Sequence, residues 1–94
     1  MATIMLMNWP EVTKELYHQV LKEVNWENDV PLGAKFLVAW FGDEGLRVLD
    51  LWDSQQAFET FVQNRLMPVT QRLGIAGQPN VTFAESERIF APNP

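Results

Sequence analysis

The chain has 94 residues with a formal net charge of −5, so it fits one domain, which we expect to span residues 1–94. It has no cysteine, which excludes disulfides, thiolate chemistry and most structural zinc sites. Nucleic acids and anionic membranes are bound by clusters of Lys and Arg, whereas the seven basic residues here are dispersed among twelve acidic ones, so we expect neither as a partner.

The first expected strand covers residues 1–7 and ends at the break Asn8–Pro10. This apolar run is too short for a signal peptide or a membrane span, so we expect a cytoplasmic protein. Thr13 can cap a helix that runs to about Val24, because apolar residues recur there at helical spacing. Residues 25–33 contain several breakers and are expected to form a loop.

Two apolar runs, residues 35–41 and 46–52, flank the turn Gly42–Gly45 and predict a β-hairpin. The length of the turn sets the register of the two strands. If the turn joins Phe41 directly to Leu46, the pairs on one face are Phe36 with Leu51, Val38 with Leu49, and Trp40 with Arg47.

Asp53 or Ser54 can cap a second helix, which is expected to reach Leu73 and to stop at Gly74. Pro68 removes one backbone hydrogen bond and should kink this helix near residues 64–67. Residues 81–90 form the last expected strand. The order βαββαβ predicts an α+β, ferredoxin-like fold, in which two helices cover one face of a four-stranded antiparallel sheet.

Both faces of the hairpin are apolar, although a sheet with one wet face normally alternates apolar and polar residues. Two helices can cover only one face, and monomers rarely expose large apolar patches. We therefore expect an isologous homodimer. The alternative is that loop 25–33 or the C-terminal tail covers the patch. The predicted interface comprises Phe36, Val38, Trp40, Arg47, Leu49 and Leu51, with a cation–π contact between Trp40 and Arg47.

Two charged residues interrupt apolar stripes. Arg65 lies in the apolar stripe of the second helix and Asp50 in the inner face of the hairpin, so the two are candidate catalytic residues that can pair. Two interpretations stay open, namely a structural ion pair and a polar pair that orients a ligand. The predicted ligand pocket comprises Tyr17, Leu37, Phe41, Asp50, Trp52, Phe61 and Arg65. His18, the only histidine, lies opposite the stripe of its helix and is expected to be exposed.

The segment Arg47–Ser54 and the aromatic helix behind it resemble the dimeric α/β-barrel proteins, which include the antibiotic-biosynthesis-type monooxygenases. Several segments also resemble a group of small bacterial proteins of undetermined function, namely Phe36–Phe41, Leu46–Ser54, Phe61–Pro68, Leu73–Gly77 and Phe90–Pro92. The resemblance implies a dimer formed sheet to sheet. In the monooxygenases it also implies a pocket where O₂ oxidises a polycyclic phenol without metal or flavin.

Trp52 matches the Trp that ends a strand in the monooxygenase pattern. Phe61 stands where that pattern often has a His, and Leu37 and Glu87 stand where the bacterial group tends to have one. A general base active at neutral pH is therefore not evident in the sequence.

Three functions remain open, and we expect no metal and no cofactor for any of them. The first is an uncharacterised dimeric barrel that binds a small aromatic or apolar ligand between sheet and helices. The second is a cofactor-independent monooxygenase or isomerase acting on a phenolic substrate. In it, Arg65 stabilises the charge of the phenolate, and Asp50 orients Arg65 or takes a proton. The third is a non-catalytic structural or interaction module. A cavity above ~300 Å³ beside Trp52 and Arg65 favours the first two, and a filled core favours the third.

Overall fold

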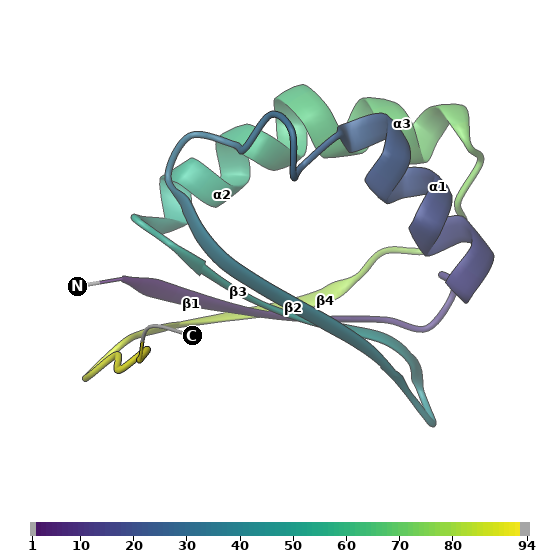
Figure 1. Ribbon diagram of the computed structural model, residues 1–94. Helices are drawn as coiled ribbons and strands as arrows, with labels where there is room; N and C mark the ends of the chain where they lie inside the picture. Colours follow the sequence, from purple (N-terminus) through teal and green to yellow (C-terminus); the bar gives the residue numbers. More distant parts are fainter. Residues whose placement is uncertain (1, 93–94) are drawn as a thin grey trace.

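The computed structural model describes residues 2–92 and has four strands in one sheet, with all the helices on one side of it (Figure 1). The elements are β1 (Thr3–Trp9), α1 (Lys14–Val24), β2 (Ala34–Gly42), β3 (Gly45–Trp52), α2 (Gln55–Phe61), the π-helical segment η1 (Val62–Leu66), α3 (Met67–Arg72) and β4 (Asn80–Glu85). The strands pair antiparallel in the order β2-β3-β1-β4. The predicted ferredoxin-like fold is confirmed.

The hairpin has the register that its turn predicts. Phe36 pairs with Leu51, Val38 with Leu49, and Trp40 with Arg47. The alternate residues of β3, Val48, Asp50 and Trp52, point to the other face, toward the helices. Asp50 therefore lies on the inner face, between Leu37 of β2 and Met5 of β1.

Both helix starts are capped by side chains. The Thr13 hydroxyl accepts a hydrogen bond from the backbone N–H of Leu16 at 3.2 Å, and the Ser54 hydroxyl accepts one from Ala57 at 3.1 Å. α1 and α2 therefore begin at the predicted places. Of the two candidate caps for the second helix, Asp53 and Ser54, the structure uses Ser54.

The second helical stretch changes its winding where the sequence predicts a kink. η1 covers residues 62–66 and ends just before Pro68. Proline has no N–H to donate, so the preceding turn cannot keep its regular bonds and widens. The stretch ends after Arg72, and Gly74 follows with φ of +66°.

Two strand boundaries differ from the prediction. β1 continues to Trp9, which pairs with Leu46 and is buried, while Met1 lies outside the described residues. β4 ends at Glu85 rather than at residue 90, because its partner β1 starts at Thr3, opposite Glu85. A strand persists only as far as its neighbour offers hydrogen bonds.

Trp52 is the centre of the core. It is fully buried, and its ring lies 5.5 Å from that of Trp26, 5.6 Å from that of Phe58 and 5.4 Å from that of Phe61. These contacts join β3, α2 and the loop after α1. Edge-to-face aromatic packing adds stability beyond the buried area. The helices are thereby fixed to the inner face at the end of the sheet where β3 meets α2.

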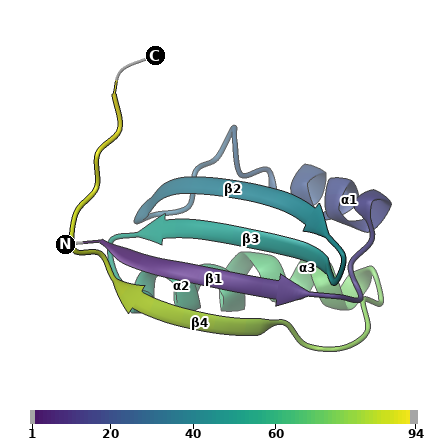
Figure 2. The ribbon, with the colours of Figure 1, turned by 90° about the horizontal axis from the view of Figure 1, so that it is seen from below.

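The outer face of the sheet carries no helix (Figure 2). Phe36 is 51% exposed, and Val38 and Trp40 are each 42% exposed. The loop after α1 lies on the helix side, where residues 31–33 face α2, and the tail after β4 lies at one end of the sheet (Figures 1 and 2). Within residues 2–92, neither this loop nor this tail therefore covers the outer face.

No helix within residues 2–92 is long and apolar enough to cross a lipid bilayer.

Candidate functional site

A cavity of about 80 Å³ lies between the sheet and the helices. Its wall is almost entirely apolar, and its aromatic members are Trp9, Tyr17, Trp26, Phe58 and Phe61. A single water needs roughly 10–15 Å³ on this measure, so the space suits a small organic molecule. It is smaller than the ~300 Å³ that marks the lower end of ordinary ligand pockets.

Asp50 is the only charged residue in this wall. It is 3% exposed, and its Oδ2 accepts a hydrogen bond from Nε1–H of Trp52 at 3.0 Å. Its Oδ1 is buried and has no hydrogen-bond partner among the described residues. Buried polar atoms are nearly always paired, since an unpaired one costs stability.

Burial raises the pKa of Asp50 to about 6, while the hydrogen bond from Trp52 acts in the opposite direction. At neutral pH most molecules therefore hold an ionised carboxylate in an apolar wall. Such a group can accept a hydrogen bond, pair with a cation or take a proton.

Tyr17 faces the same cavity from α1. Its ring lies 6.0 Å from that of Phe41 in an edge-to-face arrangement. Burial, and then the negative charges of Asp50 and Glu27, raise the pKa of the Tyr17 phenol. The phenol therefore stays neutral at physiological pH and serves as a hydrogen-bond donor or acceptor rather than as a base.

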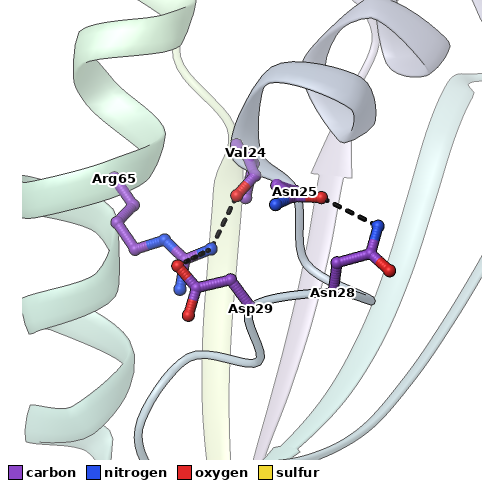
Figure 3. A network of polar contacts seen from close by, with 5 residues as sticks. All are labelled: Val24, Asn25, Asn28, Asp29 and Arg65. Atoms are coloured by element: carbon purple, nitrogen blue, oxygen red, sulfur yellow. Dashed lines mark hydrogen bonds and ion pairs between the residues drawn. The ribbon is translucent and has the colours of Figure 1, made fainter.

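The predicted pairing of Asp50 with Arg65 is wrong. Nη2 of Arg65 donates a hydrogen bond to the carbonyl oxygen of Val24 at 2.6 Å and lies 3.9 Å from Oδ2 of Asp29 (Figure 3). Val24 is the last residue of α1, whose final carbonyls lack partners within the helix and carry partial negative charge. Arg65 therefore fastens the end of α1 and the loop behind it to η1.

The loop at this contact is itself tied to the helix end. The Asn28 side-chain amide donates a hydrogen bond to Oδ1 of Asn25 at 3.0 Å (Figure 3). Asn25 adopts the left-handed conformation, with φ of +58°, and its N–H donates to the carbonyl of Leu21. The carbonyls of Leu21 and Val24 at this end of α1 thus have partners within the chain.

The structure divides the predicted pocket residues into two groups. Tyr17, Leu37, Asp50 and Phe61 line the cavity. Trp52 and Phe41 lie behind the wall, in contact with Asp50 and Tyr17. Arg65 is not part of the wall, and its guanidinium carbon lies 5.7 Å from the centre of the Phe61 ring. Trp26 and Phe58 belong to the wall although the pocket prediction omits them. Phe58 lies in the apolar stripe of its helix, whereas nothing in the sequence marks Trp26 beyond its size.

His18 is exposed on α1, as its position opposite the apolar stripe predicts. No group of three or more His, Asp or Glu residues within residues 2–92 could hold a metal ion. The chemistry that the site can offer therefore rests on Asp50 and Tyr17.

No protein-family model matches this sequence, and no curated protein matches it either. Solved structures do match. Protein NE2512 of unknown function from Nitrosomonas europaea has a TM-score of 0.68 at 11% identity, over 98% of this chain and 94% of that one.

Two similar structures are oxygenases. The monooxygenase from the gene ActVA-Orf6 of Streptomyces coelicolor, in complex with nanaomycin D, has a TM-score of 0.64 at 17% identity, over 98% of this chain and 93% of that one. SnoaB, a cofactor-independent oxygenase from Streptomyces nogalater, has a TM-score of 0.64 at 10% identity, over 97% of each chain. At these identities the likeness shows the ferredoxin-like fold alone.

Proposed function

We propose that this protein binds a small apolar molecule between its sheet and its helices, and that it does so as a cytoplasmic homodimer. One observation carries the binding proposal. Asp50 lies in the wall of a cavity, and its Oδ1 is buried and has no partner among the described residues. A ligand that donates a hydrogen bond to this oxygen would supply the missing partner.

The state of two other polar groups in the wall, the Thr70 hydroxyl and the Trp9 indole N–H, supports this proposal over a purely structural role. The Thr70 hydroxyl donates to the carbonyl of Met67 at 3.1 Å, and the Trp9 indole N–H donates to that of Ala76 at 3.5 Å. These groups are already satisfied within the fold, whereas Asp50 is not. Oδ2 of Asp50 has a structural role, because it accepts the hydrogen bond of the buried Trp52 indole N–H. An Asn at position 50 would keep that acceptor without a charge, so the negative charge of the carboxylate has no structural benefit.

The size of the cavity limits the ligand. Engineered cavities of about 150 Å³ admit benzene, so a space of about 80 Å³ suits a branched aliphatic molecule and admits one ring only if side chains adjust. We expect polycyclic molecules to be excluded unless the helices separate from the sheet.

The dimer proposal rests on the outer face of the sheet. The exposed Phe36, Val38 and Trp40 lie in one row on β2, and the half-buried Leu49 and Leu51 lie beside them on β3. A patch of this kind on a soluble protein usually marks an interface. A second copy covers it with the same apolar surface, through a closed two-fold contact.

Ligand binding can be tested with isobutanol and toluene, followed by amide and indole NMR shifts. We expect shifts centred on Asp50, Trp26 and the Trp52 indole N–H. Val20→Phe fills the cavity and should abolish them. Val62→Phe adds the same volume in the partly buried layer outside the cavity and should leave them unchanged. Wild-type protein that gives no shifts with either probe would refute the proposal.

Cofactor-independent oxygenation is the second candidate function, because Asp50 is an ionised base beside an apolar space. The likeness to two oxygenases agrees with this candidate. Asp50 would take the phenolic proton, O₂ would add to a ring carbon that bears hydrogen, and Asp50 would return the proton to the peroxide so formed. Loss of one water from this hydroperoxide would leave a quinone. Oxygen uptake with single-ring quinols tests this candidate, and uptake with anthrone requires in addition that the helices separate from the sheet. Asp50→Asn should abolish any turnover, and wild-type rates at background would eliminate the candidate.

A further inference from the structure

We propose that the natural ligand of the cavity is a small organic cation, whose protonated amine lies against Oδ1 of Asp50 and whose apolar body lies among the aromatic side chains. This inference rests on the ligand-binding function proposed above and goes further by giving the ligand a charge. The structure offers three independent supports, which are the charge of the wall, the surroundings of Asp50 and the aromatic content of the wall.

Among the described residues that line the wall, Asp50 is the one carboxylic acid, and none has a basic side chain. An anion would be repelled by Asp50, and a neutral ligand would leave its charge uncompensated in an apolar space. A cation removes the uncompensated charge and at the same time donates the hydrogen bond that Oδ1 lacks. Charge complementarity therefore favours an amine over an alcohol or phenol of the same shape.

The neighbouring elements do not supply this cation. Met5 and Leu37 flank Asp50 on the adjacent strands and carry no charge. From α1 comes the neutral phenol of Tyr17, and Glu27 in the following loop adds negative charge. From η1 comes Arg65, whose guanidinium is held by Val24 and Asp29.

The wall is also unusually aromatic for so small a space. The aromatic residues that meet around the cavity are Trp9 of β1, Tyr17 of α1, Trp26 of the following loop, and Phe58 and Phe61 of α2. The electron-rich faces of aromatic rings attract cations, and this attraction increases when water is excluded. A carboxylate combined with aromatic walls is the combination that recognises ammonium groups.

Binding of a cation must depend on the ionisation of Asp50. The pKa of Asp50 is raised to about 6, so the carboxylate is charged above that pH and neutral below it. A simple amine keeps its proton throughout this range. The affinity for the amine should therefore be high at pH 7.5 and fall as the pH drops through about 6.

Matched pairs of probes test the charge of the ligand. Isobutylamine is compared with isobutanol, and benzylamine with benzyl alcohol, by NMR titration of the Trp52 indole N–H. At pH 7.5 we expect each amine to bind roughly tenfold more tightly than its alcohol, as for other desolvated charge pairs. At pH 5 the preference should largely vanish.

Asp50→Asn keeps the shape and one hydrogen-bond acceptor but removes the charge. This variant should bind isobutanol still and lose its preference for isobutylamine. Asp53→Asn removes a carboxylate that is 60% exposed and outside the cavity wall, and it should behave as the wild type. The pH dependence of the wild type provides the same test if Asp50→Asn does not fold.

The outcomes separate the two proposals. If alcohols bind as tightly as amines to the wild type at pH 7.5, the ligand is not a cation, and the ligand-binding function stands. If neither alcohols, amines nor toluene bind, the ligand-binding function fails, and this inference fails with it.

Discussion

The two faces of β3 each carry one charged residue in apolar surroundings, and each charged group contains a buried atom without a hydrogen-bond partner in the described chain. On the inner face the atom is Oδ1 of Asp50, and on the outer face it is Nε of Arg47. Asp50 lies in the wall of the cavity between the sheet and the helices, whereas Arg47 lies under Trp40, with its guanidinium carbon 5.8 Å from the centre of the Trp40 ring.

The difference between the two faces is one of access. The inner face is covered by α1, α2 and α3, so only a small molecule can reach Asp50. The outer face is open along β2 and β3, so an extended apolar surface can pack onto it. Under the functions proposed above, β3 would present a ligand site on one side and a homodimer interface on the other.

The largest expected effect concerns the outer face. Replacing both Trp40 and Leu49 with Asp should turn a dimer into a monomer or an unfolded chain, because buried interface residues contribute about 2 kcal/mol each or more. Static light scattering at micromolar concentration measures the change. The exposed Thr60 and Gln56 of α2 provide the control, since changing both to Asp adds the same charge elsewhere. A monomeric wild type at this concentration would refute the dimer.

A smaller effect is expected on the inner face, from the ionisation of Asp50. Its pKa rises from 3.8 to about 6 on folding, so the folded state binds more protons than the unfolded state between these values. Stability should therefore fall as pH rises through this range, by about 3 kcal/mol in total. Asp50→Asn should abolish this component and be more stable than the wild type at pH 7.5. Urea denaturation at pH 4 and 7.5 measures both quantities, and equal pH profiles for the two proteins would contradict the assignment.

The smallest effect is expected at Arg65, which joins η1 to the end of α1. Arg65→Met removes the hydrogen bond to Val24 and should lower the free energy of unfolding by about 1 kcal/mol or slightly more. Asp29→Asn should change it by less than about 0.5 kcal/mol, because Asp29 is exposed and 3.9 Å away. Neither change should move the midpoint of the Trp52 indole titration near pH 6. A shift of that midpoint in Arg65→Met would restore a link between Arg65 and Asp50.

The hairpin shows what could be predicted from the sequence. Its four-residue turn fixes the register, and the register places Asp50 and Arg47 on opposite faces. The caps at Thr13 and Ser54 are equally local, since each depends on one hydroxyl and an N–H three residues later. These features do not depend on the rest of the fold.

The contacts of Arg65 could not be predicted from the sequence. A projection at 3.6 residues per turn places it in the apolar stripe, but it lies in a π-helical segment, where the wider turn changes the direction of each side chain. Its partner Val24 is 41 residues away and is available only because α1 ends there. The cavity is equally non-local, since its wall combines side chains from strands, helices and a loop.

Asp50 also bears on how this sequence should change under selection. Its ionised carboxylate weakens the fold at neutral pH, so a population screened only for survival of heating should lose it early, by replacement with Asn, which keeps an acceptor for the Trp52 indole N–H. A population screened for retention of the ligand should keep it and gather its stabilising changes elsewhere. Comparing the substitutions at position 50 in the two libraries would show whether the carboxylate serves the ligand or the fold.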